Sequence, residues 1–275
     1  MKFEMPYRDQ NSNKGTFGKV LAFCGSDNYI GASYLACLSS LKIGAGLCAL
    51  ASTKEVISSV SKMVAEIVYL DRNQGLKNID NYNTFLIGCG LGLNNLSEKL
   101  FKDLMRKLQK ETKPIVIDAD GLNLLAKTKT KFDKNSNVIL TPHPLEASRL
   151  LNCSLGDVLE DLEISAKKIT EKYQTITVLK THRTVVCNKD FSIYINQLGN
   201  SALAKAGSGD VLAGIIAGLL AQGMDSFEAA KLGVYIHSRA GEIASEELTE
   251  YCVLASELIN FFPNVIKELL PNQLI

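Results

Sequence analysis

Short apolar runs alternate with helical stretches along most of the chain. The apolar runs have the length of buried β-strands and are predicted at Val20–Cys24, Leu47–Ala51, Thr84–Gly88, Ile115–Asp118, Val138–Leu140, Thr177–Leu179 and Thr184–Cys187. Helices are predicted between them at Tyr34–Ile43, Ser97–Glu111, Gly121–Ala126, Glu146–Leu151 and Val158–Tyr173. This alternation is typical of a mostly parallel sheet with helices on both faces.

Beyond Gly209 the chain is predicted to be almost entirely helical, first to Gln222, then over Ser226–Leu248 and Leu254–Leu269. The apolar spacing after Gly209 indicates a buried helix that begins near this residue. The opposite side of that helix carries small residues that permit close backbone packing, namely Ala213, Gly214, Ala217, Gly218 and Ala221. Since no repeat or long linker interrupts the pattern, we expect one α/β domain over residues 1–275.

Composition narrows the class of protein. The chain has 275 residues, of which 46% are hydrophobic, so it can bury a sizeable core. Its formal charge of +1, without a basic block, argues against nucleic acid or a charged membrane as a partner. The longest apolar run, Val211–Ala221, is shorter than the roughly 20 residues of a membrane span. No signal peptide is evident, and the seven cysteines lack paired spacing, so we expect a cytoplasmic protein.

Glycine-rich turns follow several predicted strands. They are Gly25-Ser26, Gly88-Cys89-Gly90-Leu91-Gly92 and Asp118-Ala119-Asp120-Gly121. In an open α/β sheet, ligands bind beyond the carboxyl ends of the strands, where these turns gather. Asp118 and Asp120 fit either of two roles: helix capping, or steering of Mg²⁺ or a substrate hydroxyl. Their spacing alone does not decide between the two.

Two other polar segments also occupy strand ends. His143 lies between two prolines directly after a predicted strand, which favours a functional role over a structural one. The segment 180–184 is either a polar hairpin loop or a loop that contacts a nucleotide. His182 and His237 are separated from His143 and from any cluster of cysteines or carboxylates, which argues against a structural zinc site.

The sequence Gly207-Ser208-Gly209-Asp210 at the start of the buried helix combines an anion-binding element with a base. Backbone N–H groups from Gly207 to Gly209 are expected to face an anion, which the helix dipole favours. Asp210 would lie beside that anion and accept a proton, as proton abstraction coupled to phosphoryl transfer requires. The alternative is a buried helix with a glycine-rich entry and no catalytic role.

Together these segments resemble the ribokinase-like enzymes and, more narrowly, the ADP- or ATP-dependent NAD(P)H-hydrate dehydratases. The motifs that carry the resemblance occur in the family's order and are Gly88–Gly92, Asp118–Asn123, Thr141–Glu146, Gly199-Asn200 and Ala206–Gly214. Lys205 departs from the family's usual threonine. We interpret it as added positive charge near bound phosphates.

The resemblance implies repair of the S-epimer of hydrated NADH or NADPH, with phosphate and AMP released from ADP, or ADP from ATP. It implies that Asp210 is the catalytic base, and that the hydrate is contacted by Ala32, Gly90, His143 and Asp210. It implies an adenine-nucleotide site formed by Lys180, Thr181, His182, Arg183, Thr184 and Gly209. Mg²⁺ as a cofactor and a homo-tetrameric assembly are further implications; the metal ligands are not assigned.

Two other functions fit the same residues. A ribokinase-like kinase acting on a small alcohol, such as a vitamin precursor, would share the anion-binding turn and the aspartate base. A non-catalytic nucleotide-binding protein would share the loops, although it would have no use for Asp210. Analysis of the product separates the enzymes, because a kinase releases a stable phosphoester whereas the dehydratase releases free phosphate and reduced nicotinamide.

Overall fold

The computed structural model describes residues 3–108, 112–128 and 130–270. In this part of the chain nine strands form one sheet in the order β3-β2-β1-β4-β5-β6-β7-β8-β9. Their bounds are β1 Lys19–Phe23, β2 Leu47–Ser52, β3 Val68–Asp71, β4 Thr84–Ile87, β5 Ile115–Ile117, β6 Val138–Leu140, β7 Ile176–Leu179, β8 Val185–Cys187 and β9 Ile193–Ile195. The strands from β3 to β7 pair in parallel, and β8 and β9 add antiparallel pairs at one edge.

Side chains of the central strands alternate between two apolar clusters, one on each face of the sheet. In β1, Val20 and Ala22 belong to one cluster, whereas Leu21 and Phe23 belong to the other. All four are fully buried. Because both faces are covered, the strand is apolar at every position rather than at every second one.

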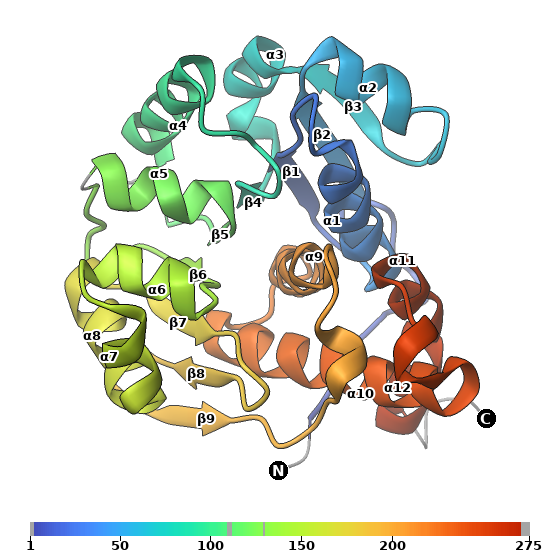
Figure 1. The fold of residues 1–275 in the computed structure, drawn as a ribbon. Helices are drawn as coiled ribbons and strands as arrows, with labels where there is room; N and C mark the ends of the chain where they lie inside the picture. Colours follow the sequence, from blue (N-terminus) through green and yellow to red (C-terminus); the bar gives the residue numbers. More distant parts are fainter. Residues whose placement is uncertain (1–2, 109–111, 129, 271–275) are drawn as a thin grey trace.

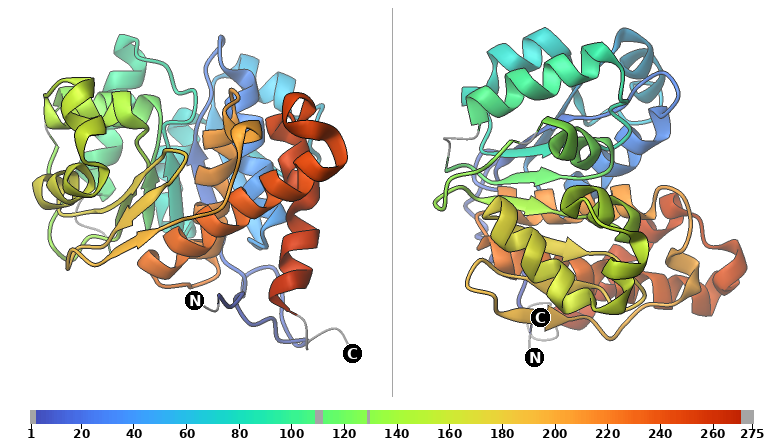
Figure 2. Two further views of the ribbon diagram at one scale, coloured as in Figure 1. Left: turned by 60° about the horizontal axis from the view of Figure 1, so that its bottom comes forward. Right: turned by 60° about the vertical axis from the view of Figure 1, so that its left-hand side comes forward.

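Helices form a layer on each face of the sheet (Figures 1 and 2). One layer contains α1 Ile30–Lys42, α2 Lys54–Val60, α9 Ser208–Ala221, α10 Ser226–Cys252, α11 Ala255–Leu258 and α12 Phe262–Leu269. The other contains α3 Arg72–Lys77, α4 Asn95–Leu108, α5 Asp120–Thr128, α6 Pro144–Leu151, α7 Leu155–Glu160 and α8 Leu162–Tyr173. The expected mostly parallel sheet with helices on both faces is therefore confirmed. None of the described helices combines the length and apolarity needed to cross a membrane.

All seven predicted strands are present, each with bounds within one residue of those expected. Strands β3 and β9 were not predicted, because their residues are exposed or only partly buried and so lack a continuous apolar signal. The short helices α2 and α3 were also not predicted. Helix α1 begins at Ile30, earlier than the expected Tyr34.

Two helices that were predicted as continuous are interrupted in the structure. The helix expected over Val158–Tyr173 is interrupted at Asp161, whose φ of −149° is not helical and whose carboxylate accepts a hydrogen bond from Ile164 N to cap α8. The helix expected over Leu254–Leu269 is divided into α11, a 3-10 turn and α12. The expected end of the helix Ser97–Glu111 lies outside the described residues, since α4 is described to Leu108.

Helix α9 lies between α1 and α10 (Figure 1) and packs closely on α1. A Cβ atom on Gly214 would lie 2.2 Å from the carbonyl oxygen of Ala36, and one on Gly218 would lie 2.3 Å from Ile43 Cγ2. The expected close packing of the small-residue side of this helix is thus confirmed. This contact holds the N-terminal end of α9 beside the carboxyl ends of the central strands.

Candidate active site

Polar residues and a glycine-rich loop follow four adjacent parallel strands, from β4 to β7, and lie next to the first turn of α9. The loop Gly88–Gly92 follows β4, and Asp118, Thr141 and Lys180 follow β5, β6 and β7. Gly88, with φ of +121°, permits the close approach of these loops, since a Cβ there would lie 2.0 Å from Asp118 O. Parallel strands bring their carboxyl ends to one edge of the sheet, which is the usual place for a ligand.

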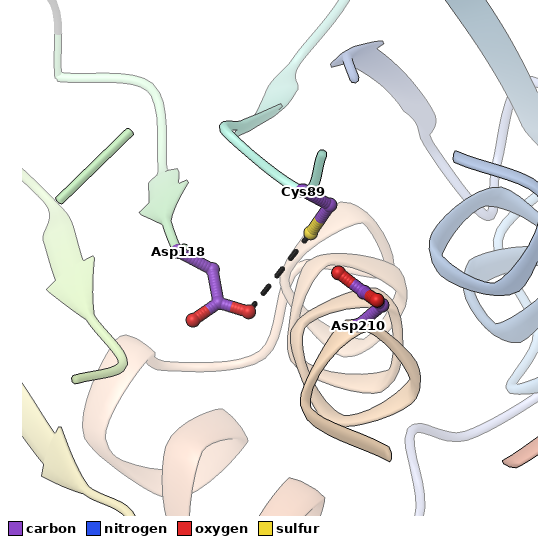
Figure 3. A group of neighbouring side chains, drawn as sticks. All are labelled: Cys89, Asp118 and Asp210. Carbon is purple, nitrogen blue, oxygen red and sulfur yellow. Dashed lines mark hydrogen bonds between the residues drawn. The ribbon is translucent and has the colours of Figure 1, made fainter. Parts of the chain in front are cut away.

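Asp210 lies in the first turn of α9, as expected, and its carboxylate faces Cys89 and Asp118 (Figure 3). The sulfur of Cys89 and one oxygen from each carboxylate all lie within 4.8 Å of one another. Burial, reinforced by the charge of Asp118, raises the pKa of Asp210 from its usual 3.8 to about 7. A carboxylate with such a pKa accepts a proton effectively near neutral pH.

Asp118 and Lys180 form an ion pair in which the Asp118 side chain is buried and the Lys180 side chain is largely buried. Asp118 is 1% exposed, and its Oδ1 accepts hydrogen bonds from Lys180 Nζ at 2.6 Å and from Thr141 Oγ1 at 2.7 Å. Burial alone would lower the pKa of Lys180, but the charges of Asp118 and Glu146 outweigh it and raise this pKa to about 12. Lys180 is thus a fixed cation. A Cβ on Gly209 would lie 3.2 Å from its Nζ, so the lysine reaches the start of α9.

His143 caps helix α6. Its ring Nδ1 accepts hydrogen bonds from Leu145 N at 3.2 Å and Glu146 N at 3.4 Å, while the backbone N–H of His143 donates to Glu146 Oε2 at 2.9 Å. Burial, aided by the charge of Lys180, lowers the pKa of His143, which agrees with a neutral ring accepting at Nδ1. Burial raises the pKa of Glu146 to about 7. His143 therefore has a structural role as the cap of α6.

A cavity of about 770 Å³ opens between this strand edge and the start of α9. Five of the six expected nucleotide-binding residues line it, namely Lys180, Thr181, His182, Thr184 and Gly209. The sixth, Arg183, is exposed and outside the lining. His143 also lines the cavity, together with apolar side chains that include Leu198, Leu203 and Leu212. A cavity of this size with a few convergent polar groups suits a small organic ligand.

The other expected hydrate-binding residues, Ala32 and Gly90, lie side by side outside that lining. A Cβ on Gly90, whose φ is +61°, would lie 2.8 Å from Ala32 Cβ. Asp120 accepts a hydrogen bond from Gly92 N at 2.8 Å and so fixes the end of this loop. Asp210 thus lies between the Ala32–Gly90 pair and the residues that line the cavity. Its carboxylate neighbours Cys89, in the same loop as Gly90, and it directly follows Gly209 in the lining of the cavity.

His237 has a role that was not predicted from the sequence. Its Nε2 lies 2.9 Å from Ser208 Oγ and 3.0 Å from Ser208 O, so α10 supports the start of α9. Burial lowers the pKa of His237 to about 4, which keeps the ring neutral. Gly207 has φ of +90°, and Ser208 N donates to Lys205 O at 3.2 Å. One of the three expected anion-binding N–H groups is thus bonded within the loop.

Comparison with known proteins identifies the family. A family model described as NAD(P)H-hydrate dehydratase matches residues 20–264 of this chain. The chain belongs to this family. Among dehydratase relatives, the ADP-dependent (S)-NAD(P)H-hydrate dehydratase of Neisseria meningitidis is 36% identical over 87% of this chain and 81% of its own length. The family expected from the sequence is confirmed.

Solved structures of similar proteins agree with the dehydratase assignment. The ADP/ATP-dependent NAD(P)H-hydrate dehydratase of Bacillus subtilis, co-crystallised with ATP and Mg²⁺, has a TM-score of 0.87 and 31% identity over 97% of this chain and 95% of its own. A ribokinase-like superfamily protein of Enterococcus faecalis has a TM-score of 0.88 and 26% identity, covering 96% and 92% of the two chains. The ribokinase-like fold is thus confirmed. The chain spans about half of the bifunctional NAD(P)H-hydrate repair enzyme of Moorella thermoacetica, 52% of its length at 37% identity.

Proposed function

We propose that this dehydratase-family chain uses ADP or ATP to dehydrate the S-epimer of hydrated NADH or NADPH, restoring NAD(P)H. The single observation that carries the proposal is the position of Asp210, a carboxylate with a pKa of about 7 that directly follows Gly209 in the lining of a ligand-sized cavity. The names of its dehydratase relatives support the reaction and the choice of epimer.

The proposed reaction begins with proton abstraction. Asp210 accepts the proton of the hydrate's hydroxyl group, and the oxygen attacks the terminal phosphorus of the nucleotide, releasing AMP from ADP or ADP from ATP. The lone pair of the ring nitrogen then expels phosphate as the C–O bond breaks. Loss of a proton from the neighbouring ring carbon restores the double bond. No second protein nucleophile is required, which agrees with a site built around one base.

Lys180 and the start of α9 supply the positive potential that the phosphates need. Lys180 is a fixed cation beside Gly209, and the helix N-terminus adds its dipole and N–H groups. Electrostatic stabilisation of a transferring phosphoryl group is commonly the largest contribution to its catalysis. Placing the adenine nucleotide in the 770 Å³ cavity directs its phosphates toward this end of α9.

Mg²⁺ fits the same edge of the site. Asp118 Oδ2, whose partner oxygen Oδ1 is already paired with Lys180, would supply an oxygen ligand of the kind that Mg²⁺ prefers, and Asp210 would stay free to accept the proton. Bound there, the ion would offset negative charge on the phosphates. The Cys89 thiol is not a ligand that Mg²⁺ favours.

The family resemblance also leads us to propose a homo-tetramer in the cytoplasm. The described cysteines are all free thiols, which supports a reducing compartment. Light scattering coupled to size-exclusion chromatography tests the assembly, and a monomer mass would contradict it.

The function is tested by supplying hydrated NADH and hydrated NADPH with ADP, ATP or GTP. We expect the absorbance of reduced nicotinamide to rise, with one phosphate released per molecule of NAD(P)H. The six combinations also establish the donor and the preferred hydrate. A stable phosphoester without reduced nicotinamide would instead support a ribokinase-like kinase, and no consumption of nucleotide would contradict both enzymes.

A further inference from the structure

Within the described residues, one group of His, Cys, Asp and Glu side chains brings three metal-ligating atoms within 4.8 Å of one another. The group consists of Cys89, Asp118 and Asp210, which come from the loop after β4, the end of β5 and the first turn of α9 (Figure 3). Cys89 and Asp118 are buried, and Asp210 is partly exposed. The fold thus converges three rigid elements on one point that solvent reaches from the side of Asp210.

The two oxygens of Asp118 have different partners. Oδ1 is held by Lys180 Nζ and Thr141 Oγ1, whereas Oδ2 faces the Cys89 thiol at 4.0 Å. The ion pair with Lys180 therefore fixes the carboxylate while leaving Oδ2 turned toward sulfur and toward Asp210. The cluster therefore offers a metal one soft ligand atom, the sulfur, and two hard ones, the carboxylate oxygens.

We propose that Cys89, Asp118 and Asp210 bind a thiophilic divalent cation, represented by Zn²⁺, which inhibits the enzyme by occupying its base. Zinc accepts thiolate and carboxylate ligands, at about 2.3 Å for sulfur and 2.0–2.2 Å for oxygen, and takes water as a fourth ligand. In a tetrahedral site these bond lengths place the ligand atoms about 3.3–3.6 Å apart, so the atoms of this cluster need to approach one another by about 1.5 Å at most. Mg²⁺ demands an octahedron of oxygens, so it does not use the sulfur.

The charges of the occupied site balance. As the sulfur–metal bond forms, the thiol proton leaves to solvent, so that a thiolate joins two carboxylates. The divalent cation and the ammonium of Lys180, 2.6 Å from Asp118 Oδ1, together compensate those three negative charges. Without the sulfur, only the two carboxylates and water would hold the cation, and its binding would weaken. Cys89 is therefore the residue that makes the site selective for the inhibitory cation over Mg²⁺.

Binding is tested with Co²⁺, whose bond to a thiolate gives a charge-transfer band in the near ultraviolet. Cys153 and Cys252 are exposed, so both are first changed to Ser to remove surface thiols. We expect this background protein to develop the band with one equivalent of Co²⁺ and to lose it on addition of Zn²⁺. Adding Cys89→Ala or Cys89→Ser should abolish the band. Absence of the band from the background protein, or its persistence in folded Cys89 variants, would overturn the proposal.

Inhibition by Zn²⁺ rests on the proposed function and is measured separately, at a fixed excess of Mg²⁺. Each protein is compared with its own rate in the absence of Zn²⁺. Loss of the sulfur ligand should raise the half-inhibitory Zn²⁺ concentration at least about 10-fold relative to the Cys153→Ser/Cys252→Ser background. Equal Zn²⁺ sensitivity in all three proteins would overturn the proposed inhibition. A chain without dehydratase activity would refute the proposed function, while the Co²⁺ band would still decide the metal site.

Discussion

The first turn of α9 and the rest of that helix have opposite chemistry. Gly209 and Asp210 in the first turn are partly exposed, and they face Lys180, Asp118 and Cys89. From Val211 to Ala221 every residue is buried, and Gly214 and Gly218 approach backbone oxygens of α1 so closely that a Cβ would lie 2.2 Å or 2.6 Å from them. The difference separates two tasks within one element. The buried part fixes the helix, and the first turn carries the chemistry.

This division explains how Asp210 keeps its unusual environment. A carboxylate beside Asp118 is repelled by it, and burial withholds the water that would stabilise its charge. A mobile helix end would relieve both effects by moving outward. The packing of α9 on α1, and the contact of Ser208 with His237 of α10, prevent that movement. The predictions below test whether function and stability divide along the helix in this way.

The largest effect is expected from Asp210→Asn. The amide keeps the shape of the side chain but accepts no proton, so kcat should fall about 1000-fold or more. The midpoint of thermal unfolding should be preserved or raised, because the variant removes repulsion from Asp118. Steady-state release of reduced nicotinamide measures the first effect and circular dichroism the second. The matched control is Asp103→Asn in α4, a partly exposed carboxylate that is paired with Arg106 and should retain wild-type kinetics when replaced. Full turnover by the Asp210 variant would show that this turn does not hold the base.

Gly214→Ala should produce the opposite result, with lost stability. The new Cβ would lie 2.2 Å from the backbone oxygen of Ala36, an atom that moves only if α1 and α9 separate. We expect the free energy of unfolding to fall by about 3 kcal/mol in urea titrations. In the control, Gly156→Ala, the nearest atom is 3.6 Å away, and a gain of up to about 1 kcal/mol is expected from helix propensity. Unchanged stability of the Gly214 variant would mean that the two helices are not held at their observed separation.

The pKa of Asp210 predicts that activity and stability respond to pH in opposite directions. Below pH 7 the base is protonated, so kcat/KM should fall about tenfold per pH unit. The folded-state pKa is above the unfolded value of 3.8, so the folded chain binds this proton more tightly. The stabilisation from Asp210 is complete below about pH 4 and is lost as the pH rises through 7. Glu146, whose pKa is also raised to about 7, acts in the same direction, whereas His237, whose pKa is lowered from 6.5 to about 4, opposes both below pH 6.5.

Rate profiles and urea titrations between pH 5 and 8 measure both trends. Relative to the wild type, Asp210→Asn should lose stability less steeply as the pH rises from 5 to 8, because the contribution of Asp210 is gone while Glu146 and His237 oppose one another. A kcat/KM that stays constant from pH 5 to 8 would contradict the assignment of Asp210 as a base with this pKa.

The same contrast explains what the sequence could predict. The central strands were predictable because burial on both faces makes them apolar at every position, whereas β3 and β9 are partly exposed at the edges of the sheet. Asp210 was predictable because a glycine-rich helix start is a local pattern. The residues that contact the catalytic turn could not be predicted from a local pattern. Cys89 meets Asp118, and Ser208 meets His237, across 29 residues of sequence in each case, and only the packed fold brings them together.

The smallest effect is expected from Lys205→Met, just before the first turn of α9. Lys205 was predicted to add charge near the phosphates, but its Nζ donates a hydrogen bond to Tyr251 O at the far end of α10. With the ammonium held there, its removal should raise the KM for ADP less than about threefold. Lys180→Met, which removes the cation beside Gly209, should raise that KM about tenfold or more. Both values come from initial rates at saturating hydrate, with unfolding curves to verify that each variant is folded. Equal increases in the two variants would mean that Lys205 leaves Tyr251 when nucleotide binds, and that the charged region extends beyond the first turn.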